Sequence, residues 1–192
     1  MPLFPSLPET AHLTDILALF PQHVESLMAL TNQIMRDDGE LSTANRELIA
    51  AYVSGLNACQ FCFKSHRIYA EVFGIAPDLI DALIEDFDAA PIAPELRPLL
   101  SYAAKLTALP SRLVPADAQA VFDAGWSEKA LFELIEVTGL FAMFNRIIEG
   151  AGVNFDYDNA RTDQRPGQSP DQSRAYLDYA ERVLSISAER AS

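Results

Sequence analysis

The chain has 192 residues, a length that fits one compact domain, or one domain with an additional arm. Hydrophobic residues make up 49% of it and charged residues 21%, so it can build an apolar core and is not an intrinsically disordered chain. Its 27 acidic residues outnumber its 14 basic residues, which gives a formal net charge of −13. Because this charge repels phosphate backbones and anionic lipids, it argues against nucleic acids and membrane surfaces as partners.

From the sequence we expect neither a membrane-spanning helix nor a secretion signal. No apolar run approaches the roughly 20 residues that a membrane-spanning helix needs. The first residues, MPLFPSLPETAH, lack both the basic and the apolar region of a signal peptide. We therefore expect a cytoplasmic protein.

Apolar residues recur at steps of three and four along almost the whole chain, and this period predicts helices. The first helix is expected to end near Leu19, and a second one to begin near Pro21 and to end before Asp37. Ser42 or Thr43 is suited to cap the next helix, because its hydroxyl can accept a hydrogen bond from an unpaired N–H group.

The middle of the chain predicts three further helices. One runs from near Asn57 through both cysteines to Gly74, and a short one begins at Pro77. Another carries Pro98 in its first turn and is ended by Pro110, because proline fits the start of a helix but cannot continue one.

The last part begins with a short helix from Pro115 to Gly125 and a long one that Ser127 caps and that runs to Gly150. The long helix is apolar on more than one face, so we expect it either in the centre of the core or at a subunit interface. The polar segment 152–170 is predicted to be a linker, and one amphipathic helix follows it. No segment alternates as a half-buried strand does, so the predicted fold class is an all-α bundle.

The two cysteines of the chain, Cys59 and Cys62, are separated by two residues. A structural disulfide that closes so short a loop would remove little unfolded-chain entropy, so the spacing indicates redox chemistry or metal binding. On one helix, Cys59, Cys62 and His66 would lie within about 60° of one another. His66 would contact Cys62 one turn away, where an imidazole can take the thiol proton or stabilise the thiolate.

Two more features fit redox chemistry at this site. We expect the start of the helix to lower the pKa of both cysteine thiols. Glu47 lies on the apolar side of the preceding helix, where a carboxylate needs a partner, and His66 is the partner that we expect. These residues therefore predict a series from Glu47 through His66 to Cys62, with Cys59 as the thiol that closes a disulfide.

Less specific interpretations remain open. Two cysteines on a helix can be small core residues, and a lone glutamate often lies only at the edge of an apolar stripe. The same four side chains have the ligand count of a zinc site, but such sites usually draw their ligands from two separated pairs, so we expect no metal and no cofactor.

Four residues outside the cysteine segment are predicted to have structural roles. His12 and His23 have no matching cysteine or acidic group and are expected to be surface or packing residues. Asn145 and Arg146 stand late in a mostly apolar helix, where they could cap it or bridge a subunit contact.

The spacing of Glu47, Cys59-x-x-Cys62 and His66 resembles the signature of the alkylhydroperoxidase D (AhpD-like) family, within the carboxymuconolactone decarboxylase superfamily. The segment RELIAAYVSGLNACQFCFKSH is similar to the peroxidase-related branch, as is FNRIIEG at residues 144–150. The resemblance implies an AhpD-like helical bundle assembled as a trimer or a hexamer.

The resemblance further implies a thiol peroxidase in which Cys62 attacks the peroxide, Cys59 resolves it, and Glu47 and His66 form a proton relay. The family's founding enzyme has a histidine immediately before the second cysteine, where this chain has Phe61. That difference removes one group that could handle protons.

We therefore expect a single AhpD-like domain over residues 1–192, with a helical arm to about residue 40, a redox core over about 41–153, and then the linker and the last helix. It would reduce a small-molecule hydroperoxide at the expense of an external dithiol. The alternatives are a redox-sensing or binding protein with little turnover, and a non-redox enzyme of the carboxymuconolactone decarboxylase type.

Overall fold

The computed structural model describes residues 1–109, 111–154 and 172–191, and all regular elements in these ranges are helices. The all-α prediction is therefore confirmed. The elements in chain order are α1 (Leu13–Leu19), a 3₁₀ turn η1 (Pro21–His23), α2 (Val24–Arg36), α3 (Thr43–Leu56), α4 (Gln60–Val72), α5 (Pro77–Glu85), α6 (Leu96–Thr107), α7 (Pro115–Asp123), α8 (Glu128–Ala151) and α9 (Ala175–Ala191).

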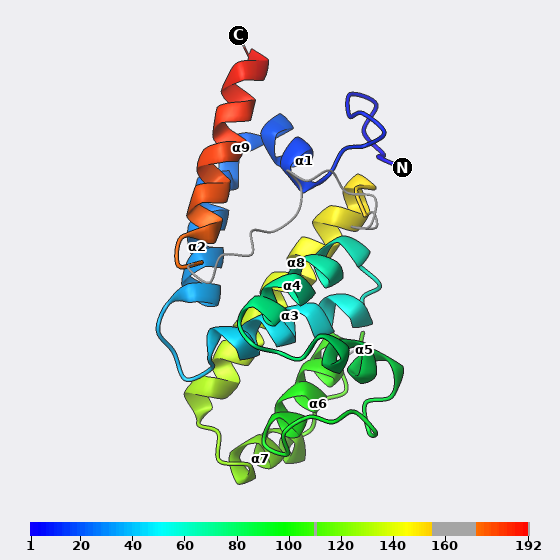
Figure 1. The fold of residues 1–192 in the computed structure, drawn as a ribbon, viewed down its shortest axis with the longest axis vertical. Helices are drawn as coiled ribbons and strands as arrows, with labels where there is room; N and C mark the ends of the chain where they lie inside the picture. Colours follow the sequence, from blue (N-terminus) through cyan, green and yellow to red (C-terminus); the bar gives the residue numbers. More distant parts are fainter. Residues whose placement is uncertain (110, 155–171, 192) are drawn as a thin grey trace.

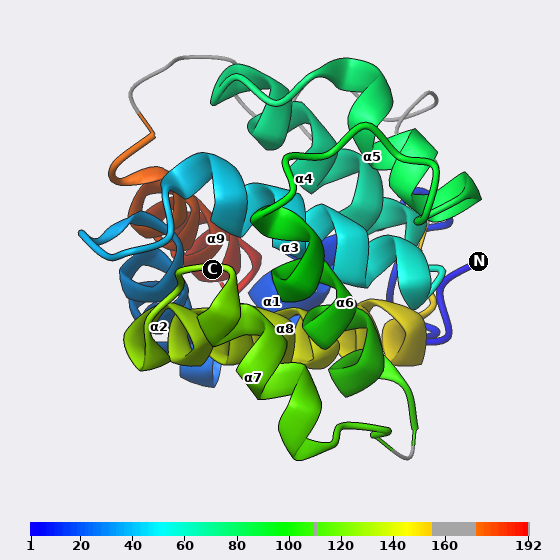
Figure 2. The same cartoon turned by 90° about the horizontal axis from the view of Figure 1, so that it is seen from below.

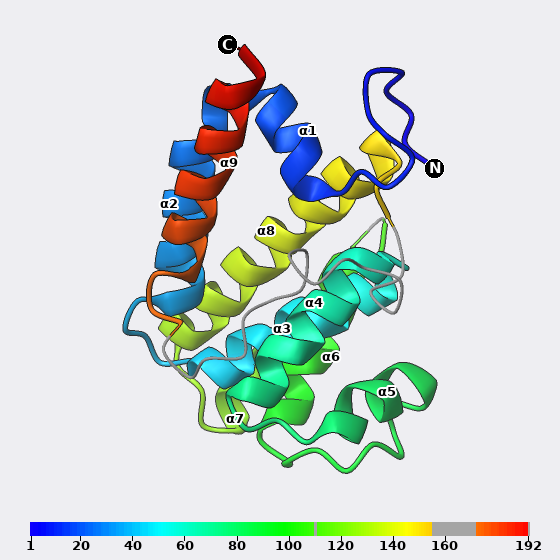
Figure 3. The same ribbon diagram turned by 45° about the horizontal axis from the view of Figure 1, so that its top comes forward.

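The long helix α8 crosses the middle of the molecule and separates two groups of helices (Figures 1 and 3). On one side lie α1, α2 and α9, and on the other lie α3 to α7. Seen from below, α9 runs beside α2, although most of the chain separates them in sequence (Figure 2). Leu134, Phe141 and Ile148 of α8 are fully buried, so of the two predicted places for this helix the core is the observed one.

The predicted N-caps are confirmed. The Ser42 hydroxyl accepts the backbone N–H of Asn45 at 3.2 Å, and the Ser127 hydroxyl accepts that of Ala130 at 3.1 Å. The end of α8 is set by Gly152, whose φ of 67° lies in the left-handed region that glycine adopts at low cost. Local capping signals thus placed the starts of α3 and α8.

The turn between α3 and α4 positions the first cysteine. The N–H of Ala58 bonds to the carbonyl of Gly55, and the N–H of Cys59 bonds to that of Ser54, which together form a Schellman motif. Cys59 has an extended backbone and is the N-cap of α4. The expectation that Cys59 lies within the helix is therefore wrong by one position, because the Schellman motif takes up residues that the periodicity assigned to the helix.

This turn contains the one described non-glycine residue with a positive φ, Ala58 at 55°. A side chain with a Cβ costs about 1 kcal/mol in this conformation, where glycine has almost no penalty. We expect Ala58→Gly to raise the free energy of unfolding by about 1 kcal/mol, measured by urea denaturation. Ala120→Gly, on the exposed side of α7, is the matched control and should lower it by about the same amount. A loss of stability in Ala58→Gly would contradict this account of the turn.

Two predictions fall partly outside the described residues. Pro110 and, from residue 155 onwards, the predicted linker 152–170 lie there. The amphipathic C-terminal helix is confirmed as α9. Within the described ranges, no helix has both the length and the apolar character that crossing a bilayer requires.

Candidate active site

Helices α3 and α4 bring Glu47 and His66 together. The two helices pack against each other more extensively than any other pair, and both residues lie on the buried side of the contact. Glu47 Oε2 lies 2.6 Å from His66 Nδ1, and the exposed fractions of the residues are 0% and 7%. A carboxylate and an imidazole at this distance share a proton-bearing hydrogen bond in a largely dry environment.

The other oxygen of this carboxylate faces a charged residue that the sequence analysis did not predict. Nη2 of Arg36, the last residue of α2, lies 2.6 Å from Glu47 Oε1 in a buried ion pair, although the angles of this contact fall outside hydrogen-bond geometry. The remaining nitrogens of the guanidinium are held by the backbone. Nε donates to the carbonyl of Gln172 at 3.0 Å, and Nη1 donates to that of Met35 at 3.0 Å.

Aromatic rings surround the guanidinium of Arg36. The rings of Tyr69 from α4, of Phe73 directly after α4 and of Tyr176 from α9 lie 4.9–5.4 Å from its central carbon. Burial opposes the positive charge, but the attraction of Tyr176 and of Glu47 outweighs it and holds the pKa of Arg36 above its ordinary value. Arg36 is therefore a permanent buried cation next to the Glu47 carboxylate.

The two thiols lie at the start of α4 and are not joined by a disulfide. The Cys62 thiol donates to the Cys59 sulfur, which raises the pKa of Cys62 well above its ordinary value, and burial raises it further. The same hydrogen bond lowers the pKa of Cys59. The expectation of two lowered thiol pKa values is thus right for Cys59 and wrong for Cys62, because only one of two coupled thiols can gain from the shared proton.

Asn145 of α8 packs against this cysteine pair. Its amide group donates to Ser54 Oγ at 3.1 Å and accepts from the Asn57 amide at 2.9 Å, and its hydrogen bonding adds to the lowering of the Cys59 pKa and partly opposes the rise of the Cys62 pKa. Asn145 is 2% exposed, so the prediction that it caps the helix or bridges subunits is wrong. Its neighbour Arg146 is exposed and donates to the carbonyl of Ala142 in its own helix.

A cavity of about 300 Å³ opens next to these groups. Cys62 and His66, one helical turn apart on α4, both line it, whereas Cys59 does not. The opposite walls are mostly aromatic and come from Phe141 and Phe144 of α8 and from three residues of α9, Tyr176, Tyr179 and Arg182. The cavity therefore gives a small molecule access to one sulfur and to the imidazole beside it.

His12 forms part of this cavity wall. It is 5% exposed, and its Nδ1 accepts the backbone N–H of Thr14 as the N-cap of α1. Its ring stacks on that of Phe61 at a centroid distance of 6.5 Å. The sequence correctly indicated a packing role, but it missed that His12 borders the same cavity as Cys62, because the contact joins two helices that are far apart in the chain.

Other site residues were also missed. Arg36 appears in the sequence only as a basic residue in the last turn of a helix, which usually interacts with the helix dipole. Tyr176 and Tyr179 were visible only as apolar positions of an amphipathic helix. Both tyrosines line the cavity because α9 packs along α2 (Figure 2).

The zinc alternative receives no support from this geometry. Both oxygens of Glu47 are engaged by Arg36 and His66. In the described part of the chain, no cluster of three or more histidine, cysteine, aspartate or glutamate side chains is arranged to hold a metal ion.

Residues 21–105 match the carboxymuconolactone decarboxylase family. Among solved structures, an uncharacterized peroxidase-related protein from Silicibacter sp. TM1040 is 28% identical with a TM-score of 0.62, and the match covers 66% of each chain, just under two thirds of that protein. The AhpD core of a peroxidase-related protein from Ralstonia eutropha JMP134 is 24% identical with a TM-score of 0.68, over 74% of this chain and 75% of that one.

The debrominase Bmp8 has the same fold. Its apo structure is 16% identical with a TM-score of 0.64, and the match covers 87% of this chain and 81% of that one. Among curated proteins, none matches the chain. The family match and the shared fold of these structures agree with the site described above: residues 21–105 are similar to the carboxymuconolactone decarboxylase family, and the chain has the AhpD-like fold.

Proposed function

We propose that this protein is a thiol-dependent peroxidase that reduces an organic hydroperoxide at Cys62. The single observation that carries the proposal is the cavity that both Cys62 and His66 line, one helical turn apart, while Glu47 bonds to Nδ1 of the imidazole. A thiol, a base and an orienting carboxylate in this order form the arrangement of an activated nucleophile. Because the pKa of Cys62 is raised by its hydrogen bond to Cys59 and by burial, its thiol is protonated at rest, and the proposed reaction requires His66 as the base.

The proposed reaction has three balanced steps. His66 takes the proton of Cys62, and the thiolate attacks the O–O bond of ROOH, so Cys62 becomes a sulfenic acid and RO⁻ leaves as the alcohol after protonation. The Cys59 thiol then condenses with the sulfenic acid, which forms the disulfide and releases water. An external dithiol reduces the disulfide by exchange and becomes a disulfide itself. No metal or cofactor takes part in these steps.

The first test is a stoichiometric oxidation. The reduced protein, mixed with one equivalent of cumene hydroperoxide, is expected to lose two thiols and to form the Cys59–Cys62 disulfide, which peptide mass spectrometry detects. Added dithiothreitol should then give continuous peroxide consumption. A protein that keeps both thiols under these conditions would contradict the proposal.

A second candidate is reductive dehalogenation, which the aromatic cavity walls favour and which the fold shared with Bmp8 makes worth testing. The same thiol pair would supply two electrons, the carbon–halogen bond would become a carbon–hydrogen bond, and halide would be released. Bromide release from a bromopyrrole, without peroxide consumption, would favour this candidate.

Disulfide formation with negligible turnover on either substrate would instead favour the redox-sensing alternative. The presence of Phe61 in place of a histidine points to that alternative.

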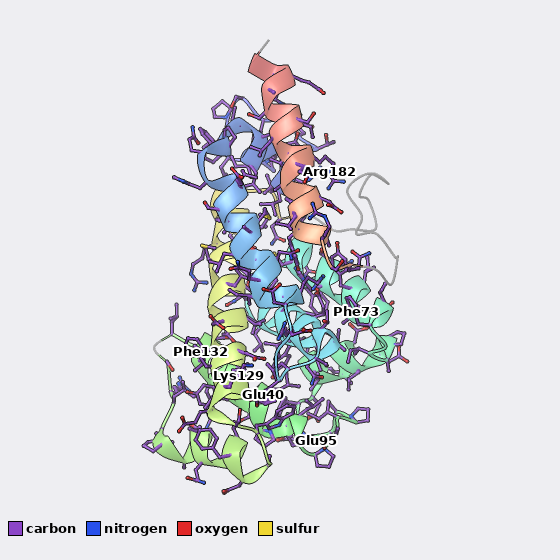
Figure 4. The ribbon with its side chains drawn as sticks, turned by 90° about the vertical axis from the view of Figure 1, so that its left-hand side faces the viewer. Glu40, Phe73, Glu95, Lys129, Phe132 and Arg182 are labelled. Atoms are coloured by element: carbon purple, nitrogen blue, oxygen red, sulfur yellow. The ribbon has the colours of Figure 1, made fainter. Side chains whose placement is uncertain are left out.

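The trimer or hexamer implied by the resemblance stays a prediction. Helix α8 offers exposed apolar surface for such an assembly. Its Phe132, labelled in Figure 4, is 58% exposed, and its Met143 is 40% exposed. Its subunit number can be measured by light scattering.

A further inference from the structure

The proposed reaction leaves one buried charged residue of the site without a role. Arg36 has an exposed side-chain fraction of 3%, and its charge is balanced by Glu47, whose side chain is fully buried. Burying such a pair brings no general gain in stability over apolar residues of similar volume. Its position on the carboxylate that bonds to His66 therefore calls for a functional explanation.

The protonation state of Glu47 decides which nitrogen of His66 is basic. An ionised carboxylate can only accept, so it receives the N–H of Nδ1 and leaves the lone pair on Nε2. A protonated carboxyl group would donate to Nδ1, and Nε2 would then carry the hydrogen. Only the first tautomer can take a proton from a thiol at Nε2, because Nδ1 is occupied by Glu47 at 2.6 Å.

Burial by itself favours the protonated carboxyl group, since charge is costly in a dry site. For Glu47 a cation lies 2.6 Å from the carboxylate, and it is held there by backbone carbonyls and three aromatic rings rather than by solvent. We propose that Arg36 is a positioning residue that keeps Glu47 ionised and thereby fixes His66 as the tautomer with a basic Nε2.

The surroundings of His66 contain no second carboxylate at hydrogen-bond distance among the described residues. The Tyr69 ring lies 5.9 Å away on its own helix, and α8 contributes the edge-on ring of Phe141 at 4.3 Å. Across the cavity, the titratable or charged groups are His12 from α1 and Tyr176, Asp178, Tyr179 and Arg182 from α9. Asp178 and Arg182 are both exposed, Asp178 is paired with Arg174 and Arg182 lies over the Tyr179 ring, so water screens both charges, whereas Arg36 and Glu47 are buried.

The role of Arg36 rests on the proposed function, but it can be tested without turnover. The readout is the ¹⁵N NMR spectrum of the histidine rings at about pH 8, which distinguishes a protonated from an unprotonated ring nitrogen. The chain has three histidines, so His66→Gln assigns the His66 signals by their loss. We expect wild-type protein to show a protonated Nδ1 and an unprotonated Nε2.

Arg36→Gln is expected to put a hydrogen on Nε2. Without the cation, the Glu47–His66 pair retains one more proton, either as a neutral carboxyl group that donates to Nδ1 or as an imidazolium, and Nε2 is protonated in both. Arg36→Lys restores the charge and should restore the unprotonated Nε2. Arg67→Gln removes a half-buried arginine next to His66 in sequence, whose partners are Glu71 and Asp81, and should change nothing.

A wild-type Nε2 that carries a hydrogen would overturn the proposal by itself, even if Arg36→Gln fails to fold. So would an unprotonated Nε2 in folded Arg36→Gln, or a protonated Nε2 in Arg36→Lys.

In the peroxidase assay, Arg36→Gln should lower kcat by about 100-fold with little change in KM, and Arg36→Lys should recover most of the lost kcat. The expected spectra in an inactive wild-type protein would leave the role of Arg36 intact and refute only the peroxidase.

Discussion

Replacing Cys62 by serine is expected to reduce peroxide turnover by about 1000-fold or more, to the level of the uncatalysed reaction with the dithiol. Cys62 is the sulfur that lines the cavity, and a serine hydroxyl there cannot form the sulfenic acid from which the disulfide arises. The assay follows the loss of cumene hydroperoxide in the presence of dithiothreitol. Circular dichroism and thermal unfolding should be close to wild type, because serine has nearly the volume of cysteine.

Cys59→Ser is the matched control and should stop the reaction one step later. Cys59 does not line the cavity, so its proposed task begins only after Cys62 has been oxidised. We expect this variant to consume one equivalent of peroxide and to retain a sulfenic acid at residue 62 that dimedone traps. The opposite result would be a sulfenic acid trapped at Cys59 in the Cys62→Ser variant and none trapped in Cys59→Ser. It would assign the attack to Cys59, the thiol whose pKa is lowered in the resting structure, and would contradict the proposed roles.

The second large effect concerns stability. Glu47→Leu is expected to lower the free energy of unfolding by about 3–5 kcal/mol, because it leaves the buried guanidinium of Arg36 without its counter-charge. The double variant Arg36→Met/Glu47→Leu removes both charges and should regain most of this loss. Urea denaturation of the wild type, the two single variants and the double variant measures the coupling directly.

An exposed ion pair provides the control for this prediction. Asp81 is 49% exposed and pairs with Arg67 at 2.7 Å, so Asp81→Ala should change the free energy of unfolding by about 0.5 kcal/mol or less. If the double variant were as unstable as Glu47→Leu, the cost would lie in lost packing and not in an unpaired charge.

The accuracy of the sequence-based predictions follows the range of the interactions involved. Ser42 and Ser127 were identified as caps because a cap bonds to an N–H group only three residues away. The meeting of Glu47 and His66 was also predictable, since adjacent helices joined by a short turn bring their apolar faces together. The position of Cys59 was missed by one residue, because the Schellman motif at Ala58 leaves no strong sequence signal when glycine is absent from it.

The sequence by itself determined the helices, most of their ends and the two thiols beside an imidazole and a carboxylate, because each of these depends on neighbours within a few turns of helix. The tertiary structure alone decided what surrounds them. The packing of α9 against α2 brings Tyr176 and the Gln172 carbonyl onto Arg36, and it closes the cavity in front of Cys62. The contacts that hold Arg36 beside Glu47 come from a segment more than 100 residues away, and such contacts have no local period or spacing, so only the folded chain reveals them.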